Sequence, residues 1–121
     1  MRPVVREQPG LSSSALCVPE FACVLQRHVR ERSLTRSQAG RLHRLFRADV
    51  DAGIWSLIEM SRPLLEEVER RVLALPPAAP LRAADAIHLT TAAEAGFGEI
   101  WTSDRHLLGA APAFGLLGTS A

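Results

Sequence analysis

Three acidic residues have the chemistry and the sequence setting of ligands for a hard divalent cation. Glu20 directly follows one predicted strand, Asp85 falls in the first turn of a predicted helix, and Asp104 ends another predicted strand. Ligands of open α/β sheets bind beyond the carboxyl ends of the strands, so these side chains can share one rim. Clustered carboxylates repel one another and need a cation or a proton between them. Mg²⁺ or Mn²⁺ prefers oxygen ligands and activates bound water, which is the chemistry of phosphodiester hydrolysis.

Each acid also has a purely structural explanation. An acid in the first turn of a helix stabilises the helix dipole, which suffices to explain Glu20 and Asp85. Asp104 can act only as the N-cap of the helix that follows it, which is worth about 1 kcal/mol. Asp85 is the hardest to explain in this way, because it lies between alanines at the edge of a buried helix face. A charge at such an edge costs free energy unless it is paired.

Three polar neighbours of these acids have two interpretations as well. His88 lies one helical turn after Asp85 and can share its face, either as a ligand or proton carrier or as a packed, hydrogen-bonded histidine. Thr102 and Ser103 immediately precede Asp104. They can orient a water molecule or a phosphate for substrate binding, or they can simply finish the strand.

Hydrophobic spacing predicts the elements that carry these residues. Residues 2–10 are predicted to be the end of a helix that runs into a turn. Strands are predicted over residues 11–17, 54–58, 99–103 and 115–118. Helices are predicted over residues 19–32, 36–52, 61–75, 81–95 and 105–111, the second opened by a capping box at Thr35 and Gln38. This alternation predicts one α/β domain, residues 1–121, with a mainly parallel sheet and helices on both faces.

Arginine is concentrated in one part of the chain, although the formal net charge is only +1. Seven arginines and a single acid, Glu31, fall between residues 27 and 47, within two helices that are predicted to form a hairpin. A basic surface of this kind can contact RNA phosphates or an acidic protein. The alternative is a solvated helix face without a partner.

Composition indicates a chain that stays in the cytoplasm. No apolar run approaches the roughly 20 residues that span a bilayer, so no membrane association is expected. The N-terminus lacks the basic and then apolar pattern of an export signal. The two cysteines, Cys17 and Cys23, are not in a Cys-x-x-Cys pair and suit packing in a reducing compartment.

Two motifs resemble the C-terminal half of PIN-domain proteins, and in particular the VapC-type toxins. These are Leu81-Arg-Ala-Ala-Asp85-Ala-Ile-His-Leu89 and Trp101-Thr-Ser-Asp104, while Ser13 to Glu20 resembles the family's second strand and its helix. The resemblance implies a three-layer α/β/α domain and a Mg²⁺- or Mn²⁺-dependent endoribonuclease whose metal is held by acids. Glu20, Asp85 and Asp104 match three of the four acids. The resemblance also implies a homodimer and a cognate antitoxin that blocks the site.

The chain departs from the family at its N-terminus. The family begins with an apolar strand that ends in an aspartate, whereas this chain has no aspartate before Asp49. The resemblance therefore implies that the first, central strand and the fourth acid are missing. Three explanations stay open: a true start upstream of Met1, a decayed copy of the gene, or a remnant that only binds a partner. We accordingly expect weak or no ribonuclease activity, and the alternative function is a non-catalytic module that binds an antitoxin or dimerises.

Overall fold

The computed structural model describes residues 5–6, 11–78 and 81–120. The strands in these ranges are β1 (Val5–Arg6), β2 (Leu11–Ser14), β3 (Trp55–Ile58), β4 (Glu99–Thr102) and β5 (Leu117–Ser120). The helices are α1 (Cys17–Arg30), α2 (Arg36–Asp51), α3 (Arg62–Leu73), α4 (Ala83–Glu94) and α5 (Arg105–Ala110), with a 3₁₀ helix η1 (Ala111–Phe114) after α5. The prediction of a mixed α/β fold is confirmed.

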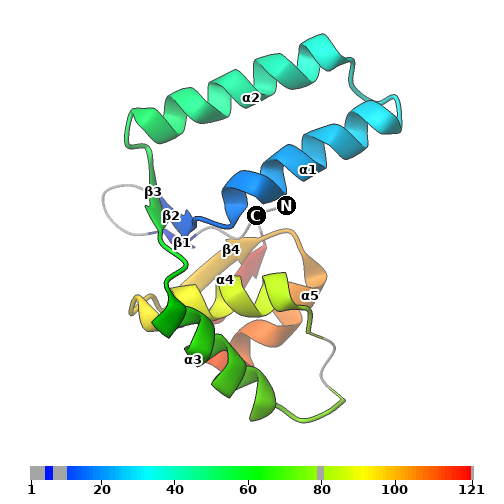
Figure 1. Ribbon diagram of the computed structural model, residues 1–121. Helices are drawn as coiled ribbons and strands as arrows, with labels where there is room; N and C mark the ends of the chain where they lie inside the picture. Colours follow the sequence, from blue (N-terminus) through cyan, green and yellow to red (C-terminus); the bar gives the residue numbers. More distant parts are fainter. Residues whose placement is uncertain (1–4, 7–10, 79–80, 121) are drawn as a thin grey trace.

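The described strands form two small sheets, where the sequence predicted one (Figure 1). In the first sheet β1 pairs antiparallel with β2, and β2 pairs parallel with β3, so that Leu11 lies opposite Trp55. In the second sheet β4 and β5 are parallel, with Glu99 opposite Leu117. The prediction of mainly parallel pairing is therefore confirmed, because two of the three strand pairs are parallel.

The prediction for the N-terminal segment is wrong where the structure describes it. Val5 and Arg6 form a strand beside β2, in place of the predicted helix end. Residues 2–4 and 7–10, which the same prediction covered, lie outside the described residues. An edge strand presents unpaired backbone groups, and β1 satisfies those of β2 at Leu11 and Ser12. Backbone pairing thus decides the conformation of a segment that has no hydrophobic periodicity of its own.

Two other element boundaries differ from the prediction because of local turn chemistry. The Ser14 hydroxyl accepts a hydrogen bond from the backbone N–H of Leu16 at 3.2 Å, which ends β2 early, so Cys17 starts α1 and is not part of the strand. Gly115 has a φ of 75°, a left-handed conformation that ends η1. The last strand consequently begins at Leu117, two residues after its predicted start at Gly115.

The main hydrophobic core lies between α4, β4, α5 and η1. Leu89 and Ile100 are completely buried, and Leu107 and Phe114 pack against them. Burial of a leucine of this size contributes roughly 1.5–3 kcal/mol. This core fixes the start of α4 relative to the end of β4, which are the two places that carry Asp85 and Asp104.

Helices α1 and α2 form an arm at one end of the molecule, away from α3 and α5 (Figure 1). We refer to residues 17–51 as the helical arm. Its two helices are joined by their own small contact surface, in which the rings of Phe21 and Phe46 lie 4.9 Å apart between centroids. The predicted capping box opens α2, because the Thr35 hydroxyl accepts from the Gln38 N–H at 3.0 Å and the Gln38 side chain accepts from the Thr35 N–H. In the described part of the chain no helix has the length and apolar character to cross a membrane.

Candidate functional site

The first turn of α4 positions Asp85. Arg82, the N-cap residue, provides no side-chain cap. Asp85 lies three residues later, in the first turn of the helix, where a negative charge suits the helix dipole. The structural role foreseen for this acid is therefore present, and the carboxylate also lies close to Asp104.

The turn between β4 and α5 positions Asp104. The backbone N–H of Asp104 donates to the hydroxyl of buried Thr102 at 3.0 Å, which closes the turn at the carboxyl end of β4. Asp104 Oδ1 then accepts from the backbone N–H groups of His106 at 2.8 Å and Leu107 at 3.3 Å. The prediction that Asp104 caps this helix is confirmed. In the described residues no hydrogen bond goes to Oδ2, so one carboxylate oxygen is left for a ligand.

The two aspartates act on each other electrostatically. Partial burial raises the pKa of the Asp85 carboxyl, and the negative charge of Asp104 raises that pKa further. The Arg82 backbone N–H and the nearby charges of His106 and Arg82 oppose this effect without cancelling it. Two carboxylates in this relation are more stable when a proton or a cation lies between them.

Glu20 reaches the same helix by a different contact. Because a carboxylate only accepts, His88 Nε2–H donates a hydrogen bond to Glu20 Oε1, at 2.5 Å. His88 is buried, and within the described residues its other ring nitrogen, Nδ1, has no hydrogen-bond partner. His88 follows Asp85 by one helical turn, so this bond holds Glu20 on the Asp85 side of α4.

A divalent cation fits the two aspartates better than it fits all three acids together. Among residues 5–6, 11–78 and 81–120 there is no group of three or more histidine, cysteine or acidic side chains that could hold a metal ion. Mg²⁺, however, is commonly bound through one or two carboxylates and keeps several waters. The Asp85–Asp104 pair offers that donor set, whereas Glu20 already bonds to His88. The assignment of Glu20 as a third ligand stays a prediction.

The two hydroxyl residues before Asp104 differ in their surroundings. Thr102 is 1% exposed and uses its oxygen to hold the turn, so it positions Asp104. Ser103 is exposed beside it. Direct contact with a substrate is therefore open to Ser103, and the predicted substrate-binding role of both residues stays a prediction.

Sequence reasoning did not foresee two features of this region. It placed His88 on the Asp85 face but did not pair it with Glu20, which lies 68 positions away in the chain. It also did not consider His106, whose charge lowers the pKa of Asp85. Only the second feature had a local signal, because His106 lies two positions after Asp104, within the predicted first turn of the last helix.

Comparison of this chain with protein-family models, with curated proteins and with solved structures found no match.

Proposed function

We propose that this chain is a metal-dependent endoribonuclease of the VapC type, with a PIN-like three-layer arrangement, acting in the cytoplasm as one member of a toxin–antitoxin pair. The observation that carries the proposal is the Asp85–Asp104 pair, in which partial burial and the facing carboxylate raise the pKa of Asp85. Such a pair favours a bound cation. A homodimer and a cognate antitoxin belong to the same proposal, and so does low activity, because the electrostatic coupling of Asp85 extends to Asp104 and not to Glu20.

Asp85 and Asp104 would hold the Mg²⁺ or Mn²⁺ ion, which when bound supplies an activated water and polarises a phosphoryl oxygen. The chain's own residues do the positioning. The first turn of α4 carries Asp85, and the Thr102 hydroxyl fixes the turn that carries Asp104. Glu20, held by His88, contributes a further negative charge next to α4. Ser103 is exposed beside Asp104 and would donate a hydrogen bond to a phosphate.

Metal binding and RNA cleavage test the proposal together. Isothermal titration with Mn²⁺ should give a binding signal for the wild type and none for Asp85→Asn or Asp104→Asn. Asparagine caps helices about as well as aspartate, so Asp104→Asn removes the charge while it preserves the cap. Cleavage of a mixed-sequence RNA should need the divalent ion, be slow, and be lost in both variants. Glu69→Gln, an exposed substitution on α3, is the matched control and should change neither result.

Failure to bind Mn²⁺ would favour the second candidate function, a non-catalytic module that binds an antitoxin or dimerises. Two observations support this candidate: Glu20 bonds to His88, and the described residues contain no group of three potential metal ligands. Such a module would keep its fold and its partner binding when both aspartates are replaced by asparagine. Cleavage or metal binding that depends on Asp85 and Asp104 would exclude it.

A further inference from the structure

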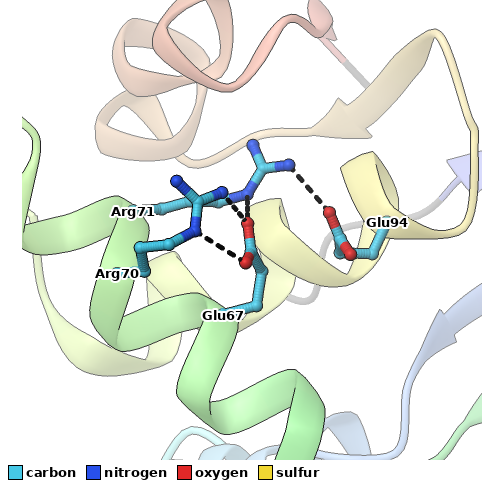
Figure 2. Close-up of polar contacts among 4 residues, drawn as sticks. All are labelled: Glu67, Arg70, Arg71 and Glu94. Atoms are coloured by element: carbon cyan, nitrogen blue, oxygen red, sulfur yellow. Dashed lines mark hydrogen bonds and ion pairs between the residues drawn. The ribbon is translucent and has the colours of Figure 1, made fainter.

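The arginines of this chain fall into two groups that differ in their partners. On α3 every arginine forms an ion pair: Arg62 with Glu66, Arg70 with Glu67, and Arg71 with both Glu67 and Glu94. Figure 2 shows Glu67, Arg70, Arg71 and Glu94. The ion pair between Arg71 and Glu94 connects α3 to α4. Arginine on α3 is thus neutralised locally and contributes to packing between helices.

The helical arm shows the opposite pattern. Arg47 pairs with Asp51, but the remaining arm arginines are exposed and form no ion pair with any described residue. These six residues, which we call the free arginines, are Arg27, Arg30, Arg32, Arg36, Arg41 and Arg44. Between Arg27 and Arg44 the sequence contains one acidic residue, Glu31. The arm therefore carries a concentrated positive charge that the near-neutral net charge of the whole chain conceals.

Helix stability explains the positions of some free arginines but not of Arg32 and Arg36. Arg27 and Arg30 lie in the last turn of α1, where a positive charge suits the helix dipole. Arg36, however, is the first residue of α2, whose first turn contains no acid, and a positive charge there opposes the dipole. Arg32 has a φ of 63°, a left-handed conformation that glycine adopts with less steric cost. Arginine at these two positions works against local stability, so helix stability does not account for Arg32 and Arg36.

The helical arm begins next to the helix that carries Asp85 and leads away from it. Glu20, in the first turn of α1, bonds to His88 on α4, one turn from Asp85. With a helical rise of 1.5 Å per residue, Arg27 and Arg30 lie about 10 and 15 Å further along α1 from Glu20. The free arginines of α2 add to this charge alongside α1, because α2 packs against α1. An extended polyanion with one phosphate at the aspartates has the length to reach the arm, whereas a small ligand does not.

We propose that the free arginines form a docking surface for an RNA strand, which binds by its phosphates and continues into the Asp85–Asp104 site. The identification of the polyanion as RNA rests on the proposed function. Six exposed guanidinium groups suit phosphate oxygens, which arginine binds through two hydrogen bonds at once. In the described arm both phenylalanines are used in the contact between helices, so recognition relies on phosphates and carries little sequence preference.

Salt-dependent RNA binding tests this proposal. Fluorescence anisotropy would follow a labelled mixed-sequence single-stranded RNA bound to the full chain, in EDTA so that no cleavage occurs. On single strands each neutralised phosphate contributes about 0.7 to the slope of log affinity against log salt. Arg41→Gln combined with Arg44→Gln should therefore reduce the magnitude of the slope by about 1.4. The control is Arg62→Gln combined with Arg70→Gln, which changes the net charge equally but replaces ion-paired arginines of α3.

Three results would overturn the docking surface: no RNA binding by the wild type, equal weakening by both double variants, or competition by polyglutamate as strong as that by RNA of equal charge. The last result would identify an acidic protein segment as the ligand. Thermal unfolding of each variant shows that it is folded. Failure of the proposed function gives a different outcome, in which the chain binds RNA through the arm but neither binds Mn²⁺ nor cleaves.

Discussion

Replacement of Asp85 by asparagine should stabilise the metal-free protein at neutral pH. Partial burial and the charge of Asp104 raise the pKa of the Asp85 carboxyl above its ordinary value of 3.8. For an acid with a raised pKa, the folded state binds the proton more tightly than the unfolded state. The stabilising contribution of the protonated group is therefore complete below pH 3.8 and is lost as the pH rises through the folded-state pKa. Above that range the ionised carboxylate destabilises the fold, and asparagine removes the charge.

The expected gain is small, because the pair is only partly buried. Exposed charge pairs contribute about 0.2–1 kcal/mol, and like charges cost a similar amount. Loss of the favourable interaction between the Asp85 charge and the α4 dipole, worth about 0.3–1 kcal/mol, acts against the gain. The raised pKa of Asp85 shows that burial and the charge of Asp104 outweigh the opposing effects of Arg82 and His106. A net stabilisation of about 0.5 kcal/mol follows, which corresponds to a rise in Tm of roughly 2–3 °C for a domain of this size.

Addition of metal should reverse this order of stability. An ion that binds only the folded state stabilises it by about 2.7 kcal/mol at one hundred times its Kd, and only the wild type retains both carboxylates. Thermal unfolding followed by circular dichroism, in EDTA and in Mn²⁺, measures both effects, and a pH series in EDTA should show the advantage of Asp85→Asn disappearing in acid. A variant that is less stable than the wild type in EDTA at neutral pH would refute the electrostatic reasoning. A wild type that Mn²⁺ leaves unchanged would refute the metal site.

Three further predictions concern the elements that position the site. His88→Leu removes the hydrogen bond that His88 Nε2–H donates to the Glu20 carboxylate and should cost about 1 kcal/mol in urea unfolding, whereas Glu20→Gln, which keeps an acceptor, should cost less. Thr35→Ala removes the N-cap of α2 and should cost about 1 kcal/mol, while Thr35→Ser should be nearly neutral; equal losses would show that the cap contributes nothing. Leu89→Ala, at a fully buried position, should cost about 3 kcal/mol, against less than about 0.5 kcal/mol for Leu73→Ala, whose residue is 80% exposed.

The sequence predicted best those features that local chemistry determines. The capping box at Thr35 and the cap at Asp104 depend on residues within one helical turn, and both have the expected partners. The division of the strands into two sheets, and the strand at Val5–Arg6, depend on backbone pairing between distant segments. No local pattern encodes such pairing. The bond between His88 and Glu20 was missed for the same reason, because α4 must pack over β2 before the two side chains meet.

Helix capping and metal binding are compatible at the two aspartates. Asp104 caps α5 through Oδ1, and Asp85 lies in the first turn of α4, where its charge suits the helix dipole, so each carboxylate has acceptor capacity left. At Asp104 asparagine would serve as the cap equally well, without repulsion from Asp85. Capping alone therefore does not explain a second carboxylate that raises the pKa of Asp85. Among the described residues, no ion pair joins either aspartate to a free arginine of the arm. The negative charge of the two aspartates is therefore what the proposed metal ion would neutralise.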